Sequence, residues 1–255
     1  MTEAAKRLVA AAGVFAIAAV TFTAIFLLPV RASDAAAPDK TAIEKIVHDY
    51  LLSHPELLQE ISRALDAKQE AAEQKMRADA LAGLGRKVLL DPKIAYVTGP
   101  SNAKVTLVEF FDYRCPHCKN SLGAMKKLTE TNKTVRFACI EFPILTDDST
   151  VAAHAALAAR RQAGKYLPFH FALMGTTGPL PKDRILSIAK QAGLDTIRLE
   201  KDMADPAIAD AIKQSIALAA KLHFNGTPTF VINDKIVVGE VTDDELVRFV
   251  NQAAG

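Results

Sequence analysis

The stretch "VEFFDYRCPHCKNSLGAM", Val108 to Met125, decides the fold of this 255-residue chain. It begins inside an apolar run, Val105 to Phe111, which is interrupted by Glu109 and has the pattern of a central strand buried on both faces. A helix is predicted to follow from Cys115, and the next cysteine, Cys118, lies on its apolar stripe. The sequence therefore predicts an α/β domain with two thiols at the turn from strand to helix.

The two cysteines of this pair occupy different positions on the predicted helix. Cys115 lies at the N-terminus, where unpaired N–H groups and the helix dipole favour an anion, and Arg114 and Lys119 add positive potential. We therefore predict that Cys115 is a thiolate with an accessible sulfur and is the nucleophile, whereas Cys118 is buried. His117, between the two cysteines, is expected to favour the thiolate further.

Other uses of the cysteine pair are disfavoured by the residues around it. A c-type haem requires a histidine directly after the second cysteine, where this chain has Lys119. A structural zinc ion requires four ligands, and the third cysteine, Cys139, has no histidine pair near it. A structural disulfide here would close a very short loop and restrain the unfolded chain little. We expect redox exchange at Cys115 and Cys118 without a cofactor or metal, and a buried, inert thiol at Cys139.

Three stretches together resemble a known family. The run "VEFFDYRCPHCK" and the later "GTPTFVIND", Gly226 to Asp234, resemble the DsbA family of thioredoxin-fold oxidoreductases. The earlier "IEKIVHDYLLSHPELLQEI" resembles the N-terminal scaffold of its ScsC branch (suppressor of copper sensitivity protein C). The resemblance extends from Ile43 to the end of the chain. It implies an α/β thioredoxin fold over residues 91–255, with a helical insertion at about 149–222.

The resemblance also implies roles for individual residues. Cys115 matches the exposed nucleophile and Cys118 its resolving partner, so that the two would form the redox disulfide. Thr227 and Pro228 match the cis-proline loop, which would offer its backbone to an extended substrate. Glu109 matches a buried acid that would pass protons to or from Cys118 through water. If Glu109 instead lay at an exposed edge, it would have no such role.

Helical patterns precede the α/β domain. The first helix has an apolar stripe made of Ile43, Ile46, Val47, Tyr50 and Leu51. A second helix is predicted from Pro55 to about Ala82, and its apolar residues follow a heptad imperfectly. We predict that residues 38–90 form a scaffold for self-association, while packing of both helices on the main domain is the alternative. The resemblance implies a homo-oligomer, and three copies are expected.

The N-terminus has the pattern of an export signal. Lys6 and Arg7 precede an uncharged run over residues 8–30, so residues 1–32 are predicted to be a signal peptide or an uncleaved inner-membrane anchor. In either case the positive charges stay in the cytoplasm and the rest of the chain reaches the periplasm. The net charge of +2 comes from interspersed charges, so no nucleic-acid partner is expected.

The predicted function is thiol-disulfide exchange with the cysteines of other exported proteins, with an unidentified membrane redox partner that restores the active site. Thr227 and the scaffold resemble isomerases, which we favour, whereas the Pro-His dipeptide between the cysteines resembles strong oxidases. A different class, a Cu(I)-binding protein in copper tolerance, stays open because two thiolates suffice for linear Cu(I). A nonenzymatic scaffold is the third possibility.

Overall fold

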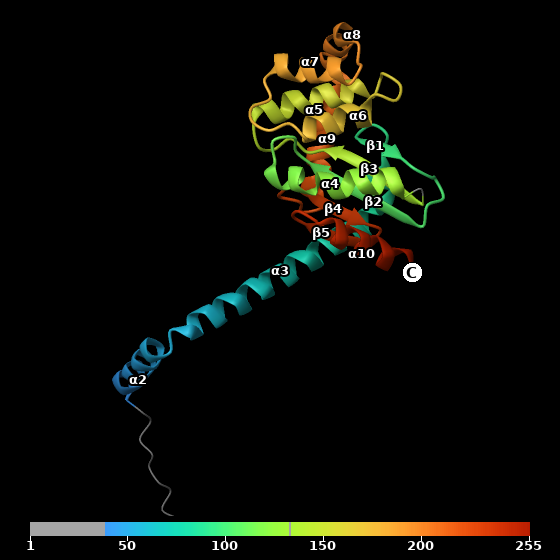
Figure 1. The fold of residues 1–255 in the computed structure, drawn as a ribbon. Coiled ribbons are helices and arrows are strands. Elements are labelled where there is room, and N and C mark those ends of the chain that lie inside the picture. Colours follow the sequence, from blue (N-terminus) through green and yellow to red (C-terminus); the bar gives the residue numbers. More distant parts are fainter. Residues whose placement is uncertain (1–38, 133) are drawn as a thin grey trace, which may run out of the picture. The chain divides into compact units, whose positions relative to one another are not determined.

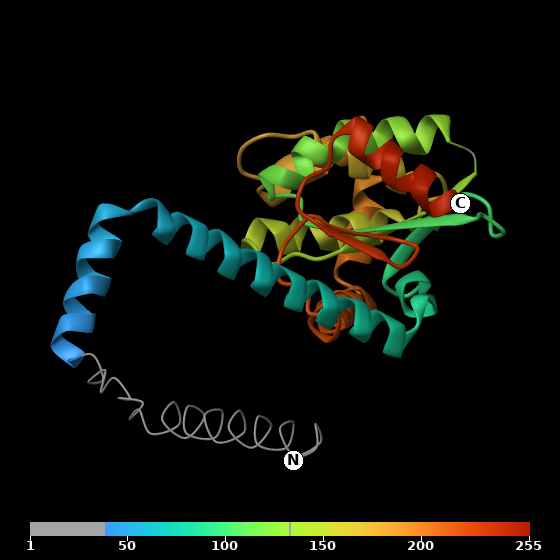
Figure 2. The ribbon, with the colours of Figure 1, turned by 90° about the horizontal axis from the view of Figure 1, so that it is seen from below.

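Figures 1 and 2 show the computed structural model, which describes residues 39–132 and 134–255. The predicted signal or anchor segment, residues 1–32, lies outside the described residues. The chain divides into two compact units, Met1–Arg63 and Ala64–Gly255. None of the helices in the described ranges combines the length and the apolar character needed to cross a membrane.

In the first unit, helix α2 (Lys40–Ser53) leads to the start of α3 (Glu56–Leu84). Asp39 caps α2, since its side chain accepts a hydrogen bond from the N–H of Thr41 at 3.3 Å. No residue of α2 is buried, and every member of its apolar stripe is exposed, from Leu51 at 37% to Ile46 at 67%. Within the described residues of the first unit, 39–63, the stripe is therefore uncovered.

The second unit is built on a five-stranded sheet with the order β1-β3-β2-β4-β5. The central strand β2 pairs in parallel with β3 and antiparallel with β4, and the two edge strands are antiparallel to their neighbours. The strands are β1 (Ala95–Thr98), β2 (Val105–Phe111), β3 (Val135–Glu141), β4 (Thr229–Ile232) and β5 (Lys235–Val238). The predicted central strand is confirmed, and six of its seven residues are buried.

Different helices cover the two faces of the sheet. On one face, α4 (Pro116–Thr131) and α10 (Asp243–Ala254) enclose a core with Leu107 and Phe230. On the other face, Leu81 near the end of α3, Leu89 of the short 3-10 helix η1 (Arg86–Leu90) and the end of α9 (Pro206–Lys221) enclose Phe110. Both faces of the sheet are therefore shielded from water, which explains the continuous apolar pattern of β2.

Five helices lie between β3 and β4 in the sequence. They are α5 (Asp147–Ala159), α6 (Tyr166–Met174), α7 (Lys182–Gln191), α8 (Thr196–Met203) and α9. Figure 1 shows α5 to α8 gathered at one end of the second unit, where they share a core with Phe111 and both cysteines of the pair. The mixed sheet with a helical insertion, which the resemblance implied, is confirmed, and the insertion closes one side of the cysteine site.

Candidate active site

The cysteine pair lies where β2 ends and α4 begins. Cys115 is the N-cap residue of α4, Pro116 is the first residue of the helix, and the N–H of Cys115 donates to the carbonyl of Asp112 at 3.1 Å. Proline suits this first position because its missing N–H would be unpaired there. The Cys115 sulfur therefore lies at the positive end of a 16-residue helix, as the sequence predicted.

One expectation needs correction, because Cys115 is not exposed. Only 3% of Cys115 and 1% of Cys118 is accessible, and both thiols are free in this structure. The reason is the loop before β4, which lies against the sulfur, so that the Cys115 thiol donates to the carbonyl of Thr227 at 3.1 Å. A partner must therefore reach the sulfur at this loop.

The protein shifts the pKa values of the two thiols in opposite directions. Hydrogen bonding with Cys118, and then with Thr227 and the backbone of Cys118 and His117, together lowers the pKa of Cys115 to about 5, although burial opposes this shift. Burial, the hydrogen bond to Cys115 and the charge of Glu109 raise the pKa of Cys118 far above its ordinary value. At neutral pH the reduced site therefore holds one thiolate and one thiol.

These shifts predict the acid titration of the reduced protein. Ultraviolet absorbance of the thiolate near 240 nm should show one step with a midpoint near pH 5, because the pKa of Cys115 is about 5. The Cys115→Ser variant should show no step in this range, since Cys118 and Cys139 stay protonated. A wild-type midpoint near 9, the ordinary value for a thiol, would contradict the assignment.

The loop opposite the cysteines contains the cis peptide bond that the resemblance implied, between Thr227 and Pro228. The Thr227 carbonyl accepts from the Cys115 thiol, whereas the buried Thr227 hydroxyl has no hydrogen-bond partner among residues 39–132 and 134–255. Once Cys115 is a thiolate it can only accept, and this hydroxyl is then a donor beside it. Thr227 thus presents both an acceptor and a donor to the sulfur.

Glu109 lies in the centre of β2, beside Cys139 of β3 and Phe230 of β4 in the register of the sheet. Only 3% of it is exposed, so the alternative of an exposed edge position does not apply. Burial, together with the nearby charge of Cys115, raises the pKa of this carboxyl to about 8. Glu109 is therefore protonated at neutral pH. It also lies close enough to both cysteines to interact with them electrostatically.

The His117 side chain does not contact the Cys115 sulfur. It is exposed, and its Nδ1 lies 2.9 Å from the Glu240 carboxylate, whose hydrogen bond raises the pKa of His117. The Cys115 charge also raises this pKa, so the imidazolium favours the thiolate through space. Glu240, which also accepts from Asn120 at 2.7 Å, was not predicted because it lies more than 120 residues away in the sequence.

The two cations beside the pair hold the insertion in place. The Lys119 ammonium donates to the carbonyls of Met174 at 3.0 Å and Thr176 at 2.6 Å, and Arg114 donates to the carbonyl of Gly178. Burial lowers the pKa of Lys119, whereas the charges of the cysteines oppose this effect. The Lys119 charge therefore interacts with the cysteines, and both cations also fix the loop after α6.

Two protein-family models match this chain. A family model described as Thioredoxin matches residues 93–252. The chain belongs to the thioredoxin family. A second model, described as the N-terminal domain of the copper resistance protein ScsC, matches residues 39–72. The predicted resemblance is thereby confirmed, to the ScsC N-terminal region over residues 39–72 and to a thioredoxin-fold protein over residues 93–252.

Solved thioredoxin-fold structures agree with this assignment. A thioredoxin-like oxidoreductase from Silicibacter pomeroyi is 45% identical, with a TM-score of 0.61, and the match covers 66% of this chain and 96% of that one. A linker-deletion mutant of Proteus mirabilis ScsC is 27% identical, with a TM-score of 0.64 and coverage of 87% and 98%. The thiol-disulfide exchange protein alpha-DsbA2 from Wolbachia pipientis is 29% identical, with a TM-score of 0.65 and coverage of 71% and 97%. A similar Salmonella enterica protein is described as periplasmic.

Curated relatives of the thioredoxin-family domain include much longer proteins. A Na(+)/H(+) antiporter NhaA 1 from Salinispora arenicola is 32% identical over 185 residues, which are 69% of this chain and 28% of that protein. The chain spans about a quarter of the length of the first curated relatives that it matches. The similarity concerns only a segment of these proteins, so their transport activity is not carried over.

A buried polar cluster of the thioredoxin-family domain was missed at the sequence level. The hydroxyls of Tyr166 and Tyr113 donate to the Glu141 carboxyl at 3.0 and 3.3 Å, and Tyr113 also lies 3.0 Å from His170 Nδ1. Burial raises the pKa of Glu141 and lowers that of His170 to about 3. The cluster is therefore neutral, and His170 packs inside it.

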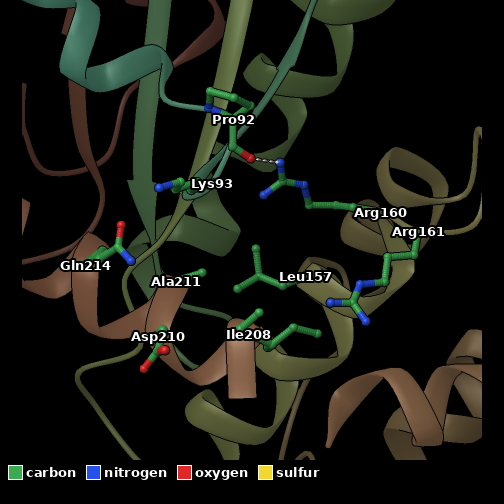
Figure 3. Close-up of a pocket in the computed structure, with 10 residues that line it drawn as sticks. Pro92, Lys93, Leu157, Arg160, Arg161, Ile208, Asp210, Ala211 and Gln214 are labelled. Carbon is green, nitrogen blue, oxygen red and sulfur yellow. Dashed lines mark hydrogen bonds between the residues drawn. The ribbon is translucent and has the colours of Figure 1, made fainter. Parts of the chain in front are cut away.

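The third cysteine and the pocket described here lie outside the cysteine-pair site. Cys139 is 4% exposed, and burial raises its pKa well above the ordinary value, as expected of an inert thiol. Within the described ranges, no group of three or more histidine, cysteine or acidic residues could hold a metal ion. A pocket of about 550 Å³, shown in Figure 3, includes neither cysteine of the pair, and Arg160 at its edge donates to the carbonyl of Pro92 at 2.5 Å.

Proposed function

We propose that this protein is an exported thiol-disulfide oxidoreductase that acts on cysteines of other exported proteins. The observation that carries the proposal is the pair of opposite pKa shifts at Cys115 and Cys118 beside the Thr227-Pro228 loop. A thiolate at neutral pH is both a ready nucleophile and a good leaving group. The homologous oxidoreductases support the same class of reaction.

The proposed reaction starts at the Cys115 thiolate. Its sulfur attacks one sulfur of a substrate disulfide, so a Cys115–substrate bond forms, the substrate S–S bond breaks, and the departing thiolate takes up a proton. The extended substrate binds along the Thr227 backbone, in the manner of an added strand. The result is a mixed disulfide with the substrate, and no external electron carrier is needed for this step.

The mixed disulfide has two outcomes. In isomerisation, a second thiolate of the substrate attacks the substrate sulfur that is bonded to Cys115. A new substrate disulfide forms and the Cys115 thiolate is released, without net change in oxidation. In reduction, Cys118 loses its proton and attacks Cys115, which leaves a Cys115–Cys118 disulfide and a substrate dithiol. Glu109, with a pKa of about 8, is suited to exchange that proton with Cys118.

Oxidation of substrates is the second candidate direction, and one observation favours it. The low pKa of Cys115 stabilises the reduced site, so a Cys115–Cys118 disulfide would readily accept electrons from a substrate dithiol. Isomerase or reductase activity remains the favoured direction because of the N-terminal helices. In either direction, a membrane redox partner would restore the working form of the site.

Two incubations of the full chain test the proposed function. With a scrambled multi-disulfide protein, an isomerase restores native pairing while remaining mostly reduced. With the reduced form of the same protein, an oxidase transfers its disulfide rapidly and does not unscramble. The Cys115→Ala, Cys118→Ala double variant is the control, and activity of this variant equal to that of the wild type would refute the proposed function.

We also propose that residues 38–90 serve as a scaffold for a homo-oligomer, with three copies expected, and that residues 91–255 form the catalytic domain. The uncovered apolar stripe of α2 supports self-association, since such a stripe is stable in water only when another surface covers it. The match of residues 39–72 to the ScsC N-terminal domain gives independent support. The C-terminal part of α3 contributes Leu81 to the core of the second unit.

The stripe predicts which substitutions separate the copies. Ile46→Glu places a charge on the stripe and should lower the mass found by equilibrium sedimentation to that of one chain, with loss of unscrambling. Leu52→Glu is the matched control, because Leu52 is 71% exposed and lies about half a turn away from the stripe. The control should keep the wild-type mass, and an unchanged mass for Ile46→Glu would contradict a role for the stripe.

Export places the proposed activity in the periplasm. Residues 1–32 would act as a signal peptide, or as an anchor in the inner membrane through residues 8–30. The family of residues 39–72 is named for copper resistance, which keeps Cu(I) binding as an alternative activity. That segment contains no cysteine, so Cu(I) would bind at Cys115 and Cys118. Stoichiometric Cu(I) binding that the double cysteine variant loses would support this alternative.

A further inference from the structure

Helix α3 buries a charge at the point where it meets the catalytic domain. Only Arg77 and Leu81 are buried in this 29-residue helix, and Arg77 is 5% exposed. A guanidinium is costly to remove from water unless its donors find partners. Its Nη2 lies 2.6 Å from the Glu73 carboxylate, and its Nε donates to the carbonyl of His223 at 3.2 Å. The second contact joins residues 146 positions apart.

His223 occupies an unusual position at the end of α9. Its N–H donates to Ala220 and the N–H of Phe224 donates to Ala219, a pattern that ends helices with one residue in the left-handed region. This residue is usually glycine, but here His223 has a φ of 57°. The carbonyl that Arg77 binds therefore belongs to a residue whose backbone conformation is disfavoured for a side chain with a Cβ.

The same turn leads directly to the active site. Phe224 is buried, with its ring edge-on to Phe110 at 5.1 Å between centroids, and the chain reaches Thr227 three residues later. Thr227 is the residue that bonds the Cys115 thiol. We propose that Arg77 is a positioning residue that acts through the His223 turn to hold Thr227 against Cys115. This inference rests on the proposed function, because it assigns Arg77 to the same site.

The titration of Cys115 in the full chain tests this inference. In Arg77→Met, the turn is no longer fixed, and the Thr227 hydroxyl, which is the donor beside the Cys115 thiolate, is held less firmly. The Cys115 midpoint should therefore rise by about one pH unit, the size expected for a weakened hydrogen bond to a charged sulfur. Lys75→Met is the control, because it removes a cation from the same helix that, among the described residues, bonds to Asp79 alone. This control should leave the midpoint unchanged.

A second variant separates the turn from general stability. Adding His223→Gly to Arg77→Met supplies the residue that adopts the left-handed conformation without strain, and should restore the wild-type midpoint. Arg77→Lys keeps the charge and should shift the midpoint less than Arg77→Met, which provides a test if the methionine variant does not fold. Circular dichroism must show each variant folded.

Two results would overturn the inference. One is an unchanged midpoint in folded Arg77→Met and Arg77→Lys, and the other is a shift that His223→Gly does not reverse. Failure of the proposed function has a different signature, because the wild type itself would then show no thiolate near pH 5 and no exchange activity. The wild-type measurement therefore decides the function, and the differences between variants decide the role of Arg77.

Discussion

The Cys118→Ala variant is expected to accumulate mixed disulfides with its substrates, while Cys115→Ser forms none. Cys115 carries the attacking thiolate, so its loss should lower the rate of exchange by about three orders of magnitude. Without Cys118, the Cys115–substrate bond forms but cannot be resolved within the site. Nonreducing electrophoresis of the trapped adducts, followed by mass spectrometry of the Cys115 peptide, measures this effect.

The third cysteine supplies the control for this experiment. Cys139 is as buried as the catalytic pair, but it lies within β3 and burial keeps its thiol protonated. Cys139→Ala should therefore retain exchange activity and trap no substrate. Adducts that form through Cys139, or wild-type activity in Cys115→Ser, would refute the assigned nucleophile.

The second large effect concerns stability, because the buried carboxyl of Glu109 opposes folding at high pH. Its pKa is 4.5 as an ordinary carboxyl and about 8 in the fold, so the folded state binds more protons between these values and stability falls as pH rises. At about 1.4 kcal/mol per pH unit, this difference corresponds to roughly 5 kcal/mol above pH 8. Glu109→Gln cannot ionise and should be more stable by up to about this amount.

Urea unfolding of both proteins in the same redox state measures the difference. The free energy of unfolding should differ little at pH 5, diverge with rising pH and reach a constant difference above pH 8. The variant should also resolve mixed disulfides more slowly, since Cys118 loses its proton-exchange partner. A variant that is less stable than the wild type at pH 8.5 would contradict the raised pKa of Glu109.

Much of the fold could be predicted because its signals are local. The continuous apolar run predicted β2 as a buried central strand. The cysteine pair at a helix start predicted an anionic sulfur, since this needs only the helix direction. The cis peptide bond before Pro228, in contrast, was predicted only from the family resemblance.

The misses share one cause, which is contact between residues distant in sequence. The Cys115 sulfur is covered by Thr227, 112 positions later, so the helix start alone suggested an exposed thiol. The Glu141 cluster joins a strand to α6 of the insertion, and Arg77 meets His223 across most of the chain. Helix and strand periodicities carry no information about which elements meet.

The Asp112 carboxylate links the active-site turn to the loop after β3. One oxygen accepts from the N–H of Arg114 at 2.7 Å, and the other accepts from the N–H groups of Ile144 and Leu145 at 2.9 and 3.1 Å. Because only backbone groups make the second contact, the exposed side chains of Ile144 and Leu145 can be exchanged without moving the sulfur. Related proteins could thus vary these two side chains while the Asp112 contacts to the active-site turn stay the same.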